Sequence, residues 1–188
     1  MKKISFLSNN KIRLIISTKT NCVLARRFHK FFNIGELRES QAERIDFQGC
    51  KVYEKMDGSL VSPVLLDSNE LIWVKRKLRD SEIENFCPKN YQEFSNHWLK
   101  KGITPLFEWC VSDKQPGILR YEKNKLVLLS LRDNVSGKYI SLEEAKESIN
   151  THQIETPREY TFSSFEELKD KIDLLTDTEG RKKKLCIF

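Results

Sequence analysis

Short apolar stretches separated by polar turns run through the first two thirds of the chain, and they predict β-strands. A hairpin is expected where a polar turn at 18–21 separates residues 12–16 from Leu24. The other predicted strands are 59–66 and 71–77, joined by a polar turn at 67–70, and 106–111 and 126–131.

Aromatic side chains at helical spacing follow these first strands. Tyr91, Phe94 and Trp98 lie on one helix face and predict an amphipathic helix over about 89–101 that ends at Gly102. Two capping-box signatures, a serine followed three residues later by a glutamate, predict further helix starts at 141–144 and 164–167. Helices interspersed among strands indicate a mixed α+β domain.

The composition narrows the class of protein. A chain of 188 residues, with 39% hydrophobic and 32% charged residues, suits one soluble globular domain. The net charge of +6 is compatible with a polyanionic partner, although residues 181–184 alone contribute four positive charges. Five cysteines without a CxxC pair argue against a zinc site or disulfide framework and indicate reduced thiols in the cytoplasm. No apolar run approaches membrane-spanning length, so we expect no membrane partner.

The hexapeptide Lys55-Met56-Asp57-Gly58-Ser59-Leu60 suits an amine that attacks phosphorus. Lysine has an ordinary pKa of about 10.4, so a reactive lysine must be deprotonated through burial or through neighbouring positive charge such as a metal ion. The adjacent glycine lets the backbone approach a ligand closely. A surface turn between strands is the alternative, because Asp-Gly-Ser is also ordinary turn chemistry.

Four segments together point to one family. They are 27–33 (RFHKFFN), 55–59 (KMDGS), 107–109 (FEW) and 125–132 (KLVLLSLR). In this order they resemble the RNA ligase 1 family, typified by the T-even bacteriophage enzyme that seals broken tRNA. The KMDGS segment resembles motif I, which DNA ligases and mRNA capping enzymes share. The first segment resembles the KFFN element of these RNA ligases, which favours an RNA ligase over the other two classes.

The resemblance implies a ligase-type nucleotidyltransferase domain over residues 1–180, with mostly antiparallel sheets and flanking helices. It also implies an ATP-dependent RNA ligase that uses Mg²⁺ and forms a lysyl-AMP intermediate. Such an enzyme joins RNA 5′-phosphate and 3′-hydroxyl ends, with tRNA as one candidate substrate. A bacteriophage source, and with it the host cytoplasm, is an inference from the family.

The resemblance assigns Lys55 as the nucleophile and eight further residues to nucleotide binding. These residues are Arg13, Lys30, Phe32, Asp57, Gly58, Lys75, Lys77 and Glu108. Glu108 matches the acid that contacts the ribose, and a strand would point it away from its two aromatic neighbours. Lys75 and Lys77, two residues apart, would share one strand face and contact phosphates.

Two arginines match the family less closely. Arg13 is followed by Leu14 where the family has glycine. Arg132 ends the segment 125–132, and the sequence leaves two roles open for it, a structural ion pair or a contact with the ligand.

The carboxyl-terminal segment departs from the family pattern. Thr178-Glu179-Gly180 resembles the start of motif IV, and Glu179 would be the magnesium-linked carboxylate. We expect no apolar strand after it, because residues 181–188 read as a basic tail or a frameshifted or truncated end. Motif V has no counterpart, so we expect impaired sealing, with a catalytically inactive RNA-binding ligase remnant as the alternative.

Overall fold

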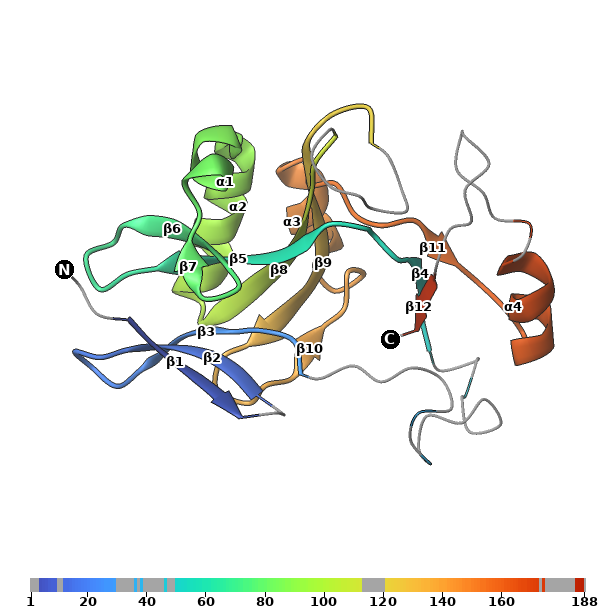
Figure 1. Ribbon diagram of the computed structural model, residues 1–188, viewed down its shortest axis with the longest axis horizontal. Helices are drawn as coiled ribbons and strands as arrows, with labels where there is room; N and C mark the ends of the chain where they lie inside the picture. Colours follow the sequence, from blue (N-terminus) through green and yellow to red (C-terminus); the bar gives the residue numbers. More distant parts are fainter. Residues whose placement is uncertain are drawn as a thin grey trace. The chain divides into compact units, whose positions relative to one another are not determined.

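The computed structural model describes residues 4–9, 12–29, 36, 38, 46, 50–112, 121–172, 174 and 185–187 (Figure 1). For residues 4–9, 12, 13, 186 and 187 the backbone alone is described. The chain divides into two compact units. The first comprises residues 1–30, 59–109 and 125–156, and the second comprises residues 31–58, 110–124 and 157–188.

A six-stranded sheet forms the centre of the first unit. Its strands lie in the order β10 (Tyr139–Ile140), β9 (Lys125–Asp133), β8 (Ile103–Cys110), β5 (Ser59–Leu65), β6 (Leu71–Lys75) and β7 (Leu78–Arg79). The pairs β10–β9, β8–β5, β5–β6 and β6–β7 are antiparallel. Most residues of β5, β8 and β9 are buried, because these inner strands are covered on both faces.

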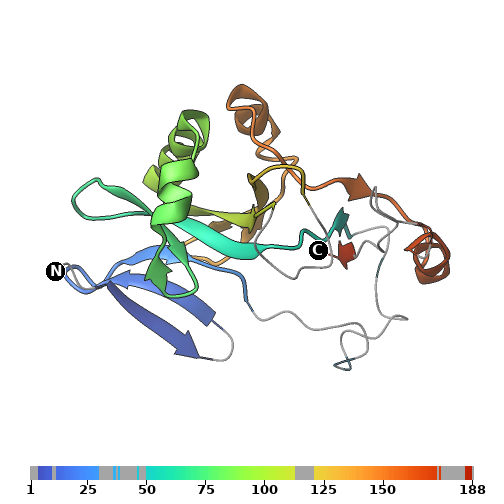
Figure 2. The same ribbon diagram turned by 45° about the horizontal axis from the view of Figure 1, so that its top comes forward.

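A smaller sheet packs against one face of the six-stranded sheet (Figures 1 and 2). It has the antiparallel order β1 (Ile4–Asn9), β2 (Ile12–Ser17) and β3 (Val23–Arg26), and β3 contacts β5. Buried apolar residues join the two sheets in one core cluster: Ile15, Ala25, Val64, Ile72 and Val74. The predicted hairpin around residues 18–21 is therefore confirmed.

Helices cover the opposite face of the six-stranded sheet (Figure 2). They include α1 (Ser81–Phe86), which contacts β6, and α2 (Lys89–Lys100), which contacts β5. The ring of Phe107 in β8 lies 5.8 Å from that of Tyr91 in α2, and Trp109 lies 4.6 Å from Phe86 in α1. Helix α2 ends as predicted, because Gly102 adopts the left-handed φ of +75°.

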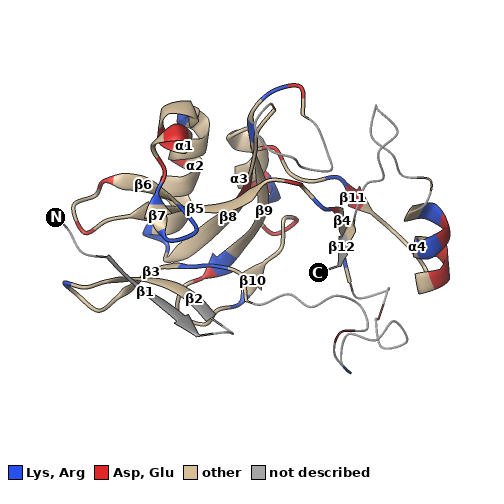
Figure 3. Ribbon diagram, in the orientation of Figure 1, with Lys and Arg blue, Asp and Glu red and all other residues tan. Residues whose placement is uncertain are grey.

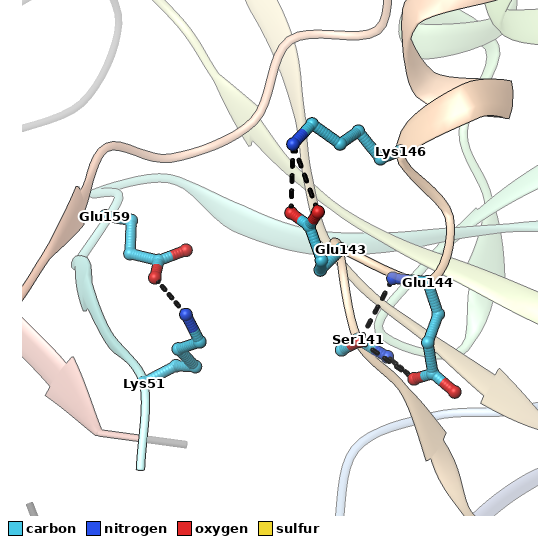
Figure 4. A network of polar contacts seen from close by, with 6 residues as sticks. All are labelled: Lys51, Ser141, Glu143, Glu144, Lys146 and Glu159. Atoms are coloured by element: carbon cyan, nitrogen blue, oxygen red, sulfur yellow. Dashed lines mark hydrogen bonds and ion pairs between the residues drawn. The ribbon is translucent and has the colours of Figure 1, made fainter. Parts of the chain in front are cut away.

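Helix α3 (Lys146–Thr151) begins later than its capping signature suggests. The backbone N–H and hydroxyl of Ser141 both donate to the Glu144 carboxylate, and the Glu144 N–H donates to the Ser141 hydroxyl (Figure 4). This is the predicted capping box, yet residues 142–145 form turns before the helix starts.

The second unit contains a three-stranded sheet and helix α4 (Phe165–Ile172). Strand β4 (Val52–Glu54) lies between β11 (Glu159–Tyr160) and β12 (Leu185–Ile187), and both pairings are antiparallel. Val52, Phe162 and Leu168 form its buried cluster. At the edge of the sheet, Lys51 Nζ lies 2.5 Å from Glu159 Oε1 (Figure 4). The expectation of no apolar strand after residue 180 is wrong, because β12 lies within the predicted basic tail and pairs with β4.

The α+β class with antiparallel sheets is confirmed. The strand predicted over 71–77 is wrong at its carboxyl end, since β6 stops at Lys75. Each helix in the described part of the chain is too short or too polar to cross a lipid bilayer.

Candidate functional site

The loop from Lys55 to Gly58 joins β4 to β5. Val52 in β4 and Met56 in the loop are buried, at 2% and 7% exposure. The Lys55 side chain is exposed, while Asp57 and Gly58 are half-buried. The inward Met56 thus anchors the loop next to Lys55 and leaves the lysine amine open to a ligand.

Tyr121 holds the backbone of this loop. The Asp57 N–H donates to Tyr121 Oη at 2.8 Å, and the Tyr121 side chain also makes a hydrogen bond with the buried thiol of Cys110, the last residue of β8. Burial raises the pKa of Tyr121 far above its ordinary value, because desolvation disfavours the phenolate. The phenol therefore stays protonated. Its oxygen accepts the hydrogen bond from the Asp57 N–H, and its O–H can donate to the Cys110 thiol.

Glu108 lies in the middle of the larger sheet, in β8. Its neighbours Phe107 and Trp109 are 0% and 1% exposed and pack on α1 and α2. Because side chains alternate along a strand, the half-buried Glu108 projects from the other face, as the sequence predicts. In the β8–β5 pairing Glu108 lies opposite Leu60, which follows Gly58 by only two residues.

Lys75 and Lys77 do not share a strand face, so that prediction is wrong. Lys75 ends β6, whereas Lys77 lies exposed in the turn before β7. Arg76 causes the difference, because its left-handed φ of +54° turns the chain and ends the strand.

Lys75 and Glu108 emerge from opposite faces of the six-stranded sheet. Val61 of β5 pairs with Lys75 on one side and with Phe107 on the other, which places Lys75 on the face that the helices cover. There the Lys75 Nζ lies 3.9 Å from the carboxylate of Asp80, the N-cap of α1. The structure therefore does not bring these two predicted nucleotide contacts together.

Among the described residues, Arg132 bonds to backbone carbonyls in place of the structural ion pair that the sequence left open, and its ligand contact stays a prediction. Its guanidinium donates to the backbone carbonyl oxygens of Arg27 and Gly137, and it lies 4.7 Å from the centre of the Tyr139 ring. These contacts tie β9 to Arg27, the first residue of the KFFN-like segment, and they assign Arg132 a structural role in the described part of the chain.

The start of the KFFN-like segment is partly buried. Arg27 and Phe28 are 4% and 2% exposed, and His29 is exposed. His29 Nδ1 lies 2.7 Å from Tyr139 Oη. Partial burial, and to a lesser extent the positive charge of Arg132, lower the pKa of His29.

Some predicted residues are not tested. Lys30, Phe32 and Glu179 lie outside the described residues. Arg13 lies in β2 opposite Ser8, and its side chain is not described. Their assigned roles stay predictions.

The donor set limits how this part of the chain could hold a metal. Among the described residues, no three His, Cys, Asp or Glu side chains come together to hold a metal ion. A Mg²⁺ ion at a nucleotide takes most of its ligands from phosphate and water and needs only one or two protein carboxylates. The described residues therefore fit a divalent cation that binds as a complex with the nucleotide, and they do not form a metal site whose ligands are all protein side chains.

The chain resembles the RNA ligase family in sequence. The sequence model of the RNA ligase family matches residues 11–185. A curated Thermovibrio ammonificans protein named "Putative RNA ligase" is 30% identical over 172 residues, which cover 89% of this chain and 44% of that protein.

Solved ligases have the same fold. A form 2 structure of an archaeal ATP-dependent RNA ligase gives a TM-score of 0.59 at 15% identity, over 92% of this chain and 50% of that chain. A mutant Naegleria gruberi RNA ligase with ATP and Mn gives a TM-score of 0.55 at 12% identity, over 73% and 45%.

The chain thus spans half or less of the length of these relatives. Because the family match runs from residue 11 to residue 185 and solved ligases share the fold, the chain belongs to the RNA ligase family.

Proposed function

We propose that this chain is the adenylyl-accepting part of an ATP-dependent RNA ligase, with Lys55 as the residue that becomes lysyl-AMP. The observation that carries the proposal is the strand register after the KMDGS loop. The loop runs directly into β5, and the first residues of β5 pair with β8 so that Leu60 lies opposite Glu108. Lys55, the proposed nucleophile, thus lies a few residues before the strand position that pairs with Glu108, the proposed ribose-binding acid.

The proposed reaction has three balanced steps. The Lys55 amine attacks the α-phosphorus of ATP, the bond to the β-phosphate oxygen breaks, and pyrophosphate leaves as the amine loses its proton. An RNA 5′-phosphate oxygen then attacks the AMP phosphorus and releases the lysine. Finally an RNA 3′-hydroxyl attacks the activated 5′-phosphate, forms the phosphodiester and releases AMP.

The exposure of Lys55 bears on the first step. A lysine becomes nucleophilic through burial or through nearby positive charge, and here the amine is exposed. A divalent cation bound with the triphosphate would supply such charge and offset the negative charge at phosphorus. Magnesium fits this role, and Glu179 is the carboxylate that we propose for it.

The proposed roles of the chain's other residues follow from their positions. Asp57 and Gly58 would place backbone against the nucleotide, with Tyr121 fixing the loop through the Asp57 N–H. Glu108 would accept hydrogen bonds from the ribose hydroxyls. RNA with a 5′-phosphate and a 3′-hydroxyl is the proposed substrate, and tRNA is one candidate.

Incubation with ATP and magnesium tests the proposal directly. We expect intact-mass spectrometry to show the gain of one AMP, and we expect Lys55→Ala to abolish it. Lys51→Ala is the matched control, because Lys51 is also exposed, lies four residues earlier and pairs with Glu159. A chain that retains RNA but never gains AMP would instead be the inactive RNA-binding remnant.

A further inference from the structure

Arg27 is a buried cation that bonds to backbone carbonyls at two places in the first unit. It follows β3 directly and is 4% exposed, although charged side chains are seldom buried. Its guanidinium donates to the Leu60 carbonyl at 2.5 Å and to the Arg76 carbonyl at 2.8 Å. The Arg27 carbonyl in turn accepts from Arg132 of β9. The residue is therefore held through its backbone while its side chain holds two other segments.

The two carbonyls mark the point where β5 and β6 separate. The β5–β6 ladder ends with the pair Val61–Lys75, so Leu60 and Arg76 would form the next pair. Arg76 ends the ladder instead, because its left-handed φ of +54° turns the chain. Two carbonyl oxygens cannot bond to each other, but the donors of one guanidinium can satisfy both. Arg27 thus bridges the two strands where their own hydrogen bonds stop.

The bond to Arg76 fixes the backbone that carries Lys77. The Arg76 carbonyl belongs to the planar peptide unit that joins Arg76 to Lys77, so its orientation constrains both residues. Lys77 itself is exposed in this basic turn (Figure 3). Lys75 lies 3.9 Å from Asp80 on the helix-covered face. Of the two lysines that the family resemblance assigns to the nucleotide, Lys77 is therefore the one that a phosphate reaches more easily.

We propose that Arg27 is a positioning residue for nucleotide binding, which holds the Lys77 backbone in place for the phosphates of ATP. The inference rests on the proposed function and on the assignment of Lys77, and it adds a residue that neither includes. The bond to Leu60 ties the turn to β5, the strand that begins directly after Gly58. Because Arg27 is buried, it acts through this backbone and does not touch ATP itself.

A purely structural Arg27 is the alternative, because the loss of a buried charge-assisted hydrogen bond destabilises any fold. The neighbouring Arg26 supplies the matched control. Its guanidinium also donates to two backbone carbonyls, that of Asn134 at 2.9 Å and that of Val135 at 3.2 Å. These carbonyls lie between β9 and β10, where no residue is assigned to the nucleotide. Arg26→Met therefore removes comparable bonds without releasing the Lys77 backbone.

Calorimetric titration of the intact chain with magnesium and an ATP analogue tests the proposal. A methylene group joins the α- and β-phosphates of this analogue, so binding is measured without AMP transfer. The variants are Arg27→Met, Arg27→Lys, Lys77→Ala, Arg26→Met and the double variant Arg27→Lys/Lys77→Ala. Arg27→Lys keeps the buried charge but lacks the fork, and it keeps the test open if Arg27→Met does not fold. Melting curves and the rate of AMP adduct formation at saturating ATP are measured in parallel.

We expect Arg27→Met and Lys77→Ala each to weaken binding of the analogue about tenfold, and Arg27→Lys to weaken it about threefold. The double variant should bind about as weakly as Lys77→Ala alone, because a residue that acts through Lys77 has no further effect once that amine is absent. The saturating rate should change less than the affinity. Arg26→Met should melt at a lower temperature and bind the analogue like the wild type.

Unchanged affinity in both Arg27 variants would overturn the proposal. So would fully additive losses in the double variant, or an equal loss in Arg26→Met, because Arg27 would then act on stability alone. A wild-type chain that binds the analogue but gains no AMP from ATP would refute the proposed adenylyl transfer, while the binding measurements would still decide the role of Arg27.

Discussion

Removal of one hydroxyl at Tyr121 should slow the proposed adenylyl transfer without unfolding the protein. In Tyr121→Phe the Asp57 N–H loses its acceptor at 2.8 Å, and the Cys110 thiol loses its hydrogen bond to the phenol. The ring itself remains, so packing changes little. The variant therefore removes the hydrogen bonds of the phenol, including the one that holds the loop after Lys55, and keeps the ring.

The expected magnitude follows from the burial of the two partners. A neutral hydrogen bond contributes about 1 kcal/mol net, and an unsatisfied donor in a fully buried site costs up to about 3 kcal/mol. Asp57 and Tyr121 are both half-buried, so we expect a loss of about 1–2 kcal/mol. If this free energy serves to orient the loop, adenylyl transfer should slow about five- to thirty-fold.

Single-turnover formation of the AMP adduct, followed by mass spectrometry at saturating ATP, is the assay. Tyr160→Phe is a matched control in the same unit, because the buried Tyr160 hydroxyl has no hydrogen-bond partner in the described part of the chain. Its removal should leave the rate unchanged. An unchanged rate in Tyr121→Phe would refute the reasoning, and a loss of unfolding free energy with no loss of rate would assign the bond to stability alone.

Three further predictions concern the site and its surroundings. Glu108→Gln should raise the ATP concentration for half-maximal adenylyl transfer about tenfold, because a charge-assisted hydrogen bond to the ribose is lost, and titration of the rate with ATP measures this. The pKa of His29 is lowered in the folded protein, so the unfolded state binds the proton at higher pH. The free energy of unfolding should therefore fall as pH drops below about 6.5, and it should fall less in His29→Gln. Urea denaturation at several pH values measures this. A steeper fall in the variant would contradict the assignment. Burial raises the pKa of Cys87 to about 12, so iodoacetamide should label exposed Cys22 and spare Cys87 at pH 8, as peptide mass mapping would report.

Local patterns sufficed for much of the fold. The apolar spacing of Tyr91, Phe94 and Trp98 and the stop at Gly102 predicted α2 almost to the residue. The polar turns at 18–21 and 67–70 likewise separate the expected strands. In each case the signal and the structure that it predicts lie within a few residues of each other.

Other features escaped prediction for physical reasons. Arg76 adopts a left-handed backbone without the glycine or asparagine that normally marks such a turn, so the sequence predicts a strand that runs on through Lys77. Tyr121 reaches Asp57 across 64 residues of sequence, a distance over which no periodicity carries information. Strand β12 has three residues and depends on its partner β4, far earlier in the chain.

The connection between β4 and β5 has a mechanical consequence. Each of these strands has a partner on both sides, β4 in the three-stranded sheet of the second unit and β5 in the six-stranded sheet of the first. The four residues from Lys55 to Gly58 are therefore tethered at both ends by strands that cannot fray from an edge. Melting of either sheet would release one end of this loop, so the stability of the β11–β4–β12 sheet and the proposed reactivity of the Lys55 amine should rise and fall together.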